Sequence, residues 1–273
     1  MILRSVLYLP ASNARAIEKA RSLDCDAVVL DLEDGVAPDR KAEARRAAIG
    51  AATEGGFGGR LLVLRVNEIG SEWADEDYRA AAASEFDALL LPKISRSADL
   101  AEARARAGGK RLWAMIETCA AMLALPEIAA AARPNDLDCL VVGTNDLAKE
   151  MRCTPGPTRA PLLAHLTAIV TAARAHGLVA IDGVCNVIDD PDLLAAECAQ
   201  GAAFGFDGKT LIHPSQIPVA NAAFAPSALQ MAWAERVIAA FALPENADKG
   251  AIRVDGAMVE RLHLIEAKRI AKV

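Results

Sequence analysis

The 273-residue sequence is poor in several residue types that mark particular protein classes. Aromatic residues make up 4% of the chain, there are four histidines, and the six cysteines form no CxxC pair. Cysteines scattered through apolar runs are typical of buried thiols in a reducing compartment, and no histidine spacing suggests zinc. A net charge of −6 without a basic stripe argues against nucleic-acid partners.

Long hydrophobic segments are also missing. No apolar run approaches the roughly 20 residues of a membrane span. Met1–Pro10 shows no signal-peptide pattern, because its short apolar core runs directly into a strand pattern. These features predict a globular, cytoplasmic, soluble protein with no membrane partner.

Short apolar runs, each followed by a helical pattern, recur along the chain. Strand–helix alternation implies right-handed crossovers and a parallel sheet. Eight such units predict an α/β fold of the (β/α)8 TIM-barrel type, for which a single unit of roughly 250 residues is usual. The alternative is a doubly wound open sheet, although no GxGxxG follows the first strand. The predicted strands are Ser5–Leu9, Ala27–Leu32, Leu61–Val66, Ala88–Leu91, Arg111–Glu117, Cys139–Val142, Leu178–Ile181 and Ala202–Phe206.

The barrel is expected to occupy residues 1–225, which leaves residues 226–273 as a C-terminal helical extension. This extension contains a predicted helix around Ser227–Leu243 and a terminal helix beginning near Met258. In the terminal helix, Val259, Leu262 and Ile265 form an apolar stripe that needs a surface to bury against. The extension is therefore predicted to be a lid or a segment that packs on a neighbouring subunit.

Two acidic side chains close consecutive apolar strands. Glu117 ends the run RLWAMIE, and Asp146 follows the next run within GTND. A carboxylate at the edge of a core needs a partner, because an unpaired buried charge is costly. A pair of carboxylates at adjacent strand ends suggests a Mg²⁺ site with all-oxygen ligands. The alternative for each residue alone is a hydrogen bond to backbone or a salt bridge to a neighbouring arginine.

Barrel enzymes carry their active sites at the carboxyl ends of the strands. Arg65 stands out there, because its guanidinium interrupts the apolar run LLVLRV and its planar fork suits a carboxylate. The alternative is a buried pair with Glu33 or Asp31. Lysines at strand ends are either Schiff-base nucleophiles or partners of the acidic groups. The full set of candidates is Glu33, Arg65, Asn67, Lys93, Glu117, Asp146, Asp182 and Lys209.

A series of motifs in a fixed order resembles a known family. RSVLYLP, AVVLDLEDGVAPDRKAEAR, LRVN, LLLPK, IET, GTNDL and FGFDGKTLIHPSQI follow one another along almost the whole chain. Together they resemble the citrate lyase β-subunit-like branch of the HpcH/HpaI aldolase family, which contains citryl-, malyl- and citramalyl-thioester lyases. The resemblance implies a Mg²⁺-dependent barrel in which Glu117 and Asp146 bind the metal. It also implies that Arg65 and Glu117 contact the substrate and take part in catalysis.

The sequence departs from the family pattern at two positions. Asn145 stands where the metal motif often has an acid. In several thioester lyases of this branch a tail Asp in a GxMxD pattern acts as acid/base and completes a neighbour's site. The matching stretch here is GAMVE, which puts Glu260 at that position as a third catalytic candidate, with Asp255 a weaker substitute. The resemblance also implies a homo-oligomer, most often a trimer.

The leading functional prediction is a Mg²⁺-dependent carbon–carbon lyase. It would cleave a 3-hydroxyacyl thioester, carried on CoA or acyl carrier protein, into an acyl thioester and a 2-oxo acid by a retro-Claisen reaction. Three alternatives remain: an aldolase acting on a free 2-oxo-4-hydroxy acid, a noncatalytic thioester-binding subunit, and a Schiff-base aldolase using Lys93 or Lys209.

Overall fold

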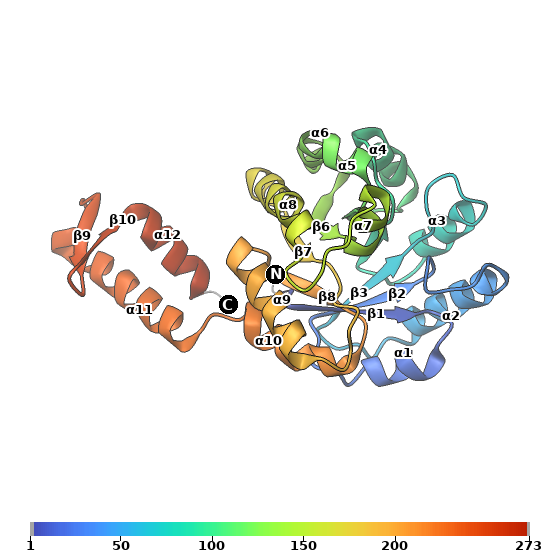
Figure 1. Cartoon of the computed structure of the whole chain (residues 1–273), viewed down its shortest axis with the longest axis horizontal. Coiled ribbons are helices and arrows are strands. Elements are labelled where there is room, and N and C mark those ends of the chain that lie inside the picture. The colour runs from blue at the N-terminus through green and yellow to red at the C-terminus, as the bar shows by residue number, and fades with distance from the viewer. Residues whose placement is uncertain (1–2, 272–273) are drawn as a thin grey trace. The chain divides into compact units, whose positions relative to one another are not determined.

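The computed structural model describes residues 3–271, which form two compact units. The first, Leu3–Phe224, contains eight strands that alternate with helices (Figure 1). Its strands are β1 Ser5–Pro10, β2 Ala27–Asp31, β3 Leu61–Arg65, β4 Ala88–Leu91, β5 Arg111–Ile116, β6 Leu137–Val142, β7 Val179–Asp182 and β8 Gly208–Leu211. Its helices are α1 Ala14–Ala20, α2 Lys41–Glu54, α3 Ala74–Ala82, α4 Ser97–Arg106, α5 Cys119–Leu123, α6 Leu125–Ala130, α7 Thr144–Met151, α8 Leu163–His176, α9 Pro191–Phe204 and α10 Ile217–Phe224.

The eight strands are parallel and each pairs with its neighbours in chain order. β8 also pairs with β1, for example Thr210 with Val6, and this pairing closes the barrel. The predicted TIM barrel is confirmed, and the open-sheet alternative is wrong. No helix within residues 3–271 combines the length and the apolar character needed to cross a bilayer.

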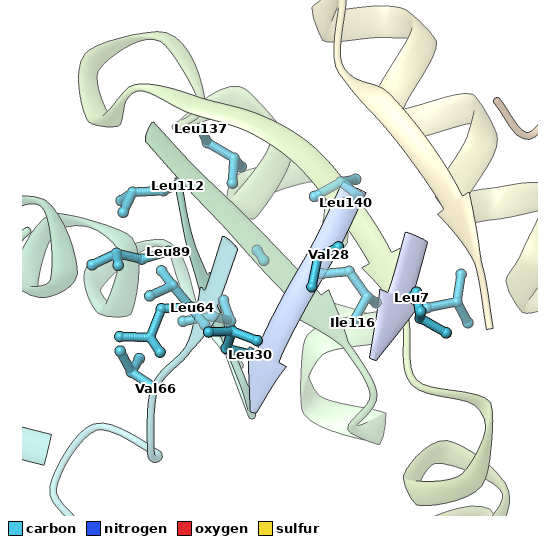
Figure 2. Close-up of a cluster of buried hydrophobic side chains, with 14 of the residues drawn as sticks. Leu7, Val28, Leu30, Leu64, Val66, Leu89, Leu112, Ile116, Leu137 and Leu140 are labelled. Carbon is cyan, nitrogen blue, oxygen red and sulfur yellow. The ribbon is translucent and has the colours of Figure 1, made fainter. Parts of the chain in front are cut away.

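Side chains along the strands alternate between two buried layers. Val63 and Met115 belong to a cluster inside the barrel, whereas Leu64 and Ile116 pack between the strands and the helices. Figure 2 shows part of this outer layer, with labelled side chains from or next to β1 to β6. Because successive side chains point to opposite faces, the inner face continues from Val63 to Arg65 and from Met115 to Glu117. The alternation therefore brings polar groups to the inner face at the strand ends.

The last strand lies later than the sequence pattern predicts, so the assignment of Ala202–Phe206 is wrong. Helix α9 continues through Phe204 and ends at Gly205, whose φ of 94° provides the left-handed cap. Alanine favours helix continuation, which explains why this apolar segment does not form a strand. β8 has the sequence GKTL and is buried at every position. Its glycine and lysine are not typical of a buried strand, so the apolar pattern does not reveal it.

Asn13 caps α1 by accepting a hydrogen bond from the backbone N–H of Ala16 at 3.1 Å.

The second unit covers residues 225–271 in the described chain and has its own core. It consists of α11 Ala228–Ala242, the antiparallel hairpin of β9 Ala251–Val254 with β10 Ala257–Glu260, and α12 Arg261–Ile270. Ser227 caps α11 by accepting from the backbone N–H of Gln230, which agrees with the helix predicted in this region.

The predicted terminal helix is present, but it begins at Arg261 rather than near Met258, which lies in β10. Asp255 and Gly256 have φ of 51° and 84° and reverse the chain between β9 and β10. Val259 consequently lies in a strand and is buried in the core of this unit. Leu262 and Ile265 are 58% and 72% exposed, so the predicted stripe reduces to these two positions. Packing on a neighbouring subunit stays a prediction.

Candidate active site at the barrel mouth

A pocket of about 390 Å³ opens at the carboxyl ends of the strands. Its wall combines residues of six strands, all except β4 and β7, with the first turn of α7 and with loops at the same end of the barrel. Arg65, Glu117 and Asp146 all line it. The closed barrel thus brings these three candidates to one cavity, although they are far apart in the sequence.

Arg65 is anchored by two acidic side chains from β2 and the loop after it. Its Nε lies 2.6 Å from Asp31 Oδ1, and its Nη2 lies 2.7 Å from Asp31 Oδ2. Its Nη1 lies 2.5 Å from Glu33 Oε2. Burial opposes the charge of Arg65, but these carboxylates outweigh burial and the net effect raises its pKa. Arg65 therefore forms the buried ion pair that was the alternative prediction, with both Asp31 and Glu33. These two contacts fix the position of the guanidinium.

Lys93 holds the two predicted metal ligands together. Its Nζ lies 2.9 Å from Asp146 Oδ2 and 3.3 Å from Glu117 Oε1. Its backbone N–H also donates to Glu117 Oε1 at 2.8 Å. Lys93 adopts a left-handed backbone with φ of 54°, which is costly for a residue with a Cβ and is typical of functional sites. The two carboxylates therefore converge on one positive charge.

One oxygen of Glu117 has no hydrogen-bond partner. Glu117 is 0% exposed, and its Oε2 is buried and unsatisfied. Gly143 makes room for this oxygen, because a Cβ at that position would lie 2.3 Å from it. An unsatisfied buried carboxylate oxygen calls for a cation or donor that the protein itself does not supply. Glu117 and Asp146 therefore fit a bound metal ion.

A metal ion bound here would have few protein ligands. The described residues contain no group of three or more His, Cys, Asp or Glu side chains that could hold a metal. Mg²⁺ is commonly bound by one or two carboxylates together with waters and substrate oxygens. A two-carboxylate site open to the pocket agrees with that preference and disagrees with a closed structural site.

Burial shifts the titration of the acidic residues. It raises the pKa of Glu33 to about 7, against the opposing attraction of Arg65. It also raises the pKa of Glu117, and Lys93 opposes this effect. For Lys93, burial acts against the charge, but Glu117 and the other acidic groups outweigh it and raise its pKa. A Schiff-base nucleophile needs a lowered pKa, so the environment of Lys93 argues against that alternative.

Asp182 and Lys209 lie outside the pocket. Asp182 accepts two hydrogen bonds from Arg159 Nη1, each 2.8 Å, and lies 3.2 Å from Lys209 Nζ. Lys209 also lies 2.9 Å from Glu197 Oε2 on α9. Their neighbours Ile181 and Thr210 take the inner positions, so strand alternation turns Asp182 and Lys209 toward the helices. Lys209 is fully buried and its ammonium is paired with Asp182 and Glu197, so it is not available to a substrate in the pocket.

Asn67 is also part of a supporting network. Its side chain accepts from Lys41 Nζ at 2.7 Å and donates to Asp77 Oδ2 at 2.6 Å. Lys41 further donates to the backbone oxygens of Leu32 and Glu33, at 2.7 Å each. Lys41 was not predicted, because a lysine in a charged helix start reads as solvated. It fixes the loop that carries Glu33.

The structure adds other pocket residues that the sequence did not single out. Tyr8 and Met115 line the pocket from within apolar runs, a pattern that does not distinguish them from core residues. Asn145 and Asn186 exchange two side-chain hydrogen bonds, of 3.1 and 2.7 Å, across the pocket rim. Asn145 therefore ties α7 to the loop after β7 in the position where the family often has an acid.

Glu260 belongs to the second unit. It is half-buried at the N-terminal end of α12, and its backbone N–H donates to His263 Nδ1 at 2.9 Å.

Similarity to known proteins extends along nearly the whole chain. A (3S)-malyl-CoA thioesterase of Cereibacter sphaeroides strain KD131 is 47% identical over 97% of this chain and 92% of the relative. The mitochondrial citramalyl-CoA lyase of Homo sapiens is 32% identical over 97% of this chain and 83% of its own. The structure of CitE from Mycobacterium tuberculosis in complex with magnesium, acetoacetate and coenzyme A matches with a TM-score of 0.80. That match has 32% identity and covers 98% of this chain and 96% of the other.

The family model for HpcH/HpaI aldolase/citrate lyase matches residues 4–214, which include all eight strands of the barrel. The motif order, the closed barrel and these relatives agree. The chain belongs to the HpcH/HpaI aldolase/citrate lyase family.

Proposed function

We propose that this protein is a Mg²⁺-dependent enzyme that acts on a short hydroxyacyl-CoA thioester of the malyl type, with thioester hydrolysis as the first candidate reaction. The observation that carries the proposal is the convergence of Arg65, Glu117 and Asp146 on one pocket. The choice of hydrolysis rests on the 47% identical (3S)-malyl-CoA thioesterase, which aligns with 97% of the chain. This choice revises the sequence-based prediction, which put carbon–carbon cleavage first.

Arg65 is the proposed carboxylate-binding group. Asp31 and Glu33 hold its guanidinium in place, so the side chain does not need to reorganise when substrate enters. A pre-organised cation binds an anion at a lower entropic cost than a flexible one. Arg65 would therefore set the position of the acyl group relative to Glu117 and Asp146.

Glu117 and Asp146 are the proposed metal ligands. Their support is the unsatisfied Glu117 Oε2 and the cationic position between the two carboxylates, where Lys93 Nζ lies. A bound Mg²⁺ would supply positive charge that polarises substrate oxygens. Glu117, held through the backbone N–H of Lys93, would also keep substrate oxygens in register with Arg65.

In hydrolysis, water loses a proton to a base while its oxygen adds to the thioester carbonyl. The C–S bond then breaks, and the sulfur of CoA leaves as a thiol after it takes up a proton. Glu260 is the proposed proton carrier, brought to the pocket by the extension of a neighbouring subunit in a proposed trimer. Its carboxylate occupies the tail position where related lyases carry an Asp.

Carbon–carbon cleavage is the second candidate, and the 32% identical citramalyl-CoA lyase favours it. There a base removes the proton of the substrate hydroxyl, and the C–C bond next to the forming carbonyl breaks. The acyl-CoA enolate then takes up a proton. The M. tuberculosis neighbour, in complex with magnesium, acetoacetate and coenzyme A, supports a pocket that can hold an oxo acid.

One assay separates the two reactions. The protein is incubated with Mg²⁺ and (3S)-malyl-CoA, and free CoA thiol and glyoxylate are measured in parallel. Hydrolysis releases thiol and malate without glyoxylate, whereas cleavage releases glyoxylate and acetyl-CoA without thiol. Both activities should be lost in Arg65→Ala and kept in Glu127→Gln, which removes an exposed carboxylate on α6. Failure to release either product from malyl-, citramalyl- and citryl-CoA would overturn the proposal.

A further inference from the structure

Two hydrogen-bond donors in the pocket share one weak acceptor. Tyr8 Oη donates to Met115 Sδ at 3.8 Å, and Arg65 Nη1 donates to the same sulfur at 3.9 Å. All three side chains line the pocket. A thioether sulfur accepts hydrogen bonds only weakly, so both donors retain most of their capacity.

The other donors of Arg65 are already used. Its Nε and Nη2 donate to Asp31, and its Nη1 also lies 2.5 Å from Glu33 Oε2. Among the described residues, the N–H of Nη1 that points to Met115 therefore has only the weak sulfur acceptor. Tyr8 is in the same situation, because no other acceptor for its hydroxyl is found within residues 3–271.

The ring of Tyr8 is held in place. The Arg65 guanidinium lies over the ring, 5.1 Å from its centroid, in a cation–π contact. Tyr8 has partial exposure because it faces the pocket, while Leu7 and Leu9 on either side are buried in the outer layer. Burial raises the pKa of Tyr8, so its hydroxyl keeps the proton that it donates.

We propose that Tyr8 is a specificity-determining residue whose hydroxyl, together with Arg65 Nη1, binds the carboxylate of the acyl group. In the complex, a carboxylate oxygen of the substrate replaces the Met115 sulfur as the acceptor for both donors, so each donor gains a charged partner. A neutral donor and a cationic donor that point to the same position bind a carboxylate there more strongly than they bind a methyl group. This inference rests on the proposed function for the identity of the substrate.

The test uses Tyr8→Phe, which removes the hydroxyl and keeps the ring that packs against Arg65. Two substrates that differ at one group are compared: (3S)-malyl-CoA, and (3R)-3-hydroxybutyryl-CoA, which has the same spatial arrangement with a methyl in place of the carboxylate. The variant should lose about tenfold in kcat/KM for malyl-CoA, chiefly through KM, because one hydrogen bond to a charged group is lost. For 3-hydroxybutyryl-CoA, kcat/KM should change less than twofold, so the preference falls by the same order.

Tyr78→Phe is the matched control. Tyr78 lies on α3, is 2% exposed, and has an Arg106 guanidinium 4.7 Å from its ring centroid. It repeats the cation–π contact of Tyr8 in a position that does not line the pocket. Its loss of the hydroxyl should leave both substrates unaffected. An equal loss of kcat/KM for both substrates in Tyr8→Phe would overturn the proposal.

A binding measurement separates this inference from the proposed function. Calorimetric titration of the protein with (S)-malate and Mg²⁺ should give an affinity about tenfold weaker in Tyr8→Phe than in wild type. If wild type turns over no malyl-CoA but the malate result holds, the proposed function fails and the role of Tyr8 stands. If wild type does not bind malate, or both proteins bind it equally, the role of Tyr8 is refuted.

Discussion

Lys93 contacts Glu117 Oε1 twice, through its backbone N–H at 2.8 Å and through its Nζ at 3.3 Å. The same Nζ reaches Asp146 at 2.9 Å. One residue in a left-handed conformation thus sets the spacing of the two proposed metal ligands and neutralises part of their charge. The following predictions depend on this arrangement and on its neighbours.

Lys93→Gln should make stability depend on Mg²⁺. Without metal, the loss of the ammonium leaves Glu117 buried beside Asp146 without a cation, which should cost about 1–3 kcal/mol. Bound Mg²⁺ should restore most of that loss, because it supplies the missing charge. Chemical unfolding in EDTA and in Mg²⁺ measures the difference. The same destabilisation in both conditions would contradict the metal assignment.

Asp146→Ala should reduce Mg²⁺ affinity at least tenfold and leave the fold intact. The Asp146 side chain is 30% exposed, so little packing is lost. Glu117→Ala should have the same effect on metal and activity, with a larger loss of stability because Glu117 is fully buried. Titration calorimetry with Mg²⁺ measures the affinity, and Glu127→Gln is the control. Normal Mg²⁺ binding by either variant would remove that residue from the site.

Arg65→Lys should impair both catalysis and stability. Lysine keeps the charge but lacks the fork that pairs with Asp31 at 2.6 and 2.7 Å. We expect kcat/KM to fall by one to several orders of magnitude, with Mg²⁺ affinity roughly unchanged. Kinetics, unfolding and Mg²⁺ titration are measured on the same preparation. A loss of stability above about 2 kcal/mol with normal kinetics would leave Arg65 a purely structural role.

The raised pKa of Glu33 should make the stability of the protein depend on pH. Its pKa is raised from 4.5 to about 7, so the folded protein holds a proton that the unfolded chain releases. The contribution of Glu33 is therefore fully present below about pH 4.5 and is lost as the pH rises through 7. Glu33→Gln cannot titrate, so the stability of wild type relative to this variant should fall by about 1–3 kcal/mol across that window. Stability is measured by denaturant unfolding in EDTA. If the difference in stability between wild type and Glu33→Gln does not change with pH, the raised pKa of Glu33 is refuted.

Glu260→Gln should lower kcat more than it raises KM, because the amide keeps the shape and cannot accept the proton. Mixing this variant with Arg65→Ala subunits should restore part of the activity if Glu260 acts in a neighbour's pocket. Glu266→Gln, which changes a half-buried carboxylate on α12 within the same unit that pairs with Arg269, is the control. Persistent inactivity after confirmed subunit exchange would exclude a shared site. Full activity of Glu260→Gln alone would exclude Glu260 from the mechanism.

The sequence alone determined the barrel and the depth at which the main candidates lie. Apolar runs of strand length that alternate with helical patterns indicate a parallel sheet buried on both faces, and a count of eight units indicates closure, although the eighth strand, GKTL, is not itself an apolar run. A charge at the end of such a run, as at Arg65, Glu117 and Asp146, must lie where the strand leaves the core. The position of these charged residues at the strand ends follows from the cost of burying a charge alone, so predicting it requires no knowledge of the packing.

Only the tertiary structure decided which strand-end residues meet. A strand that is apolar on both faces does not reveal which face points inward, and a shift of one residue exchanges the faces. Closure placed Arg65 and Glu117 inside and turned Asp182 and Lys209 toward the helices. Contacts between distant segments then placed Lys93 between two carboxylates and Tyr8 beside Arg65, because pairing of polar groups depends on their three-dimensional proximity rather than on their order in the chain.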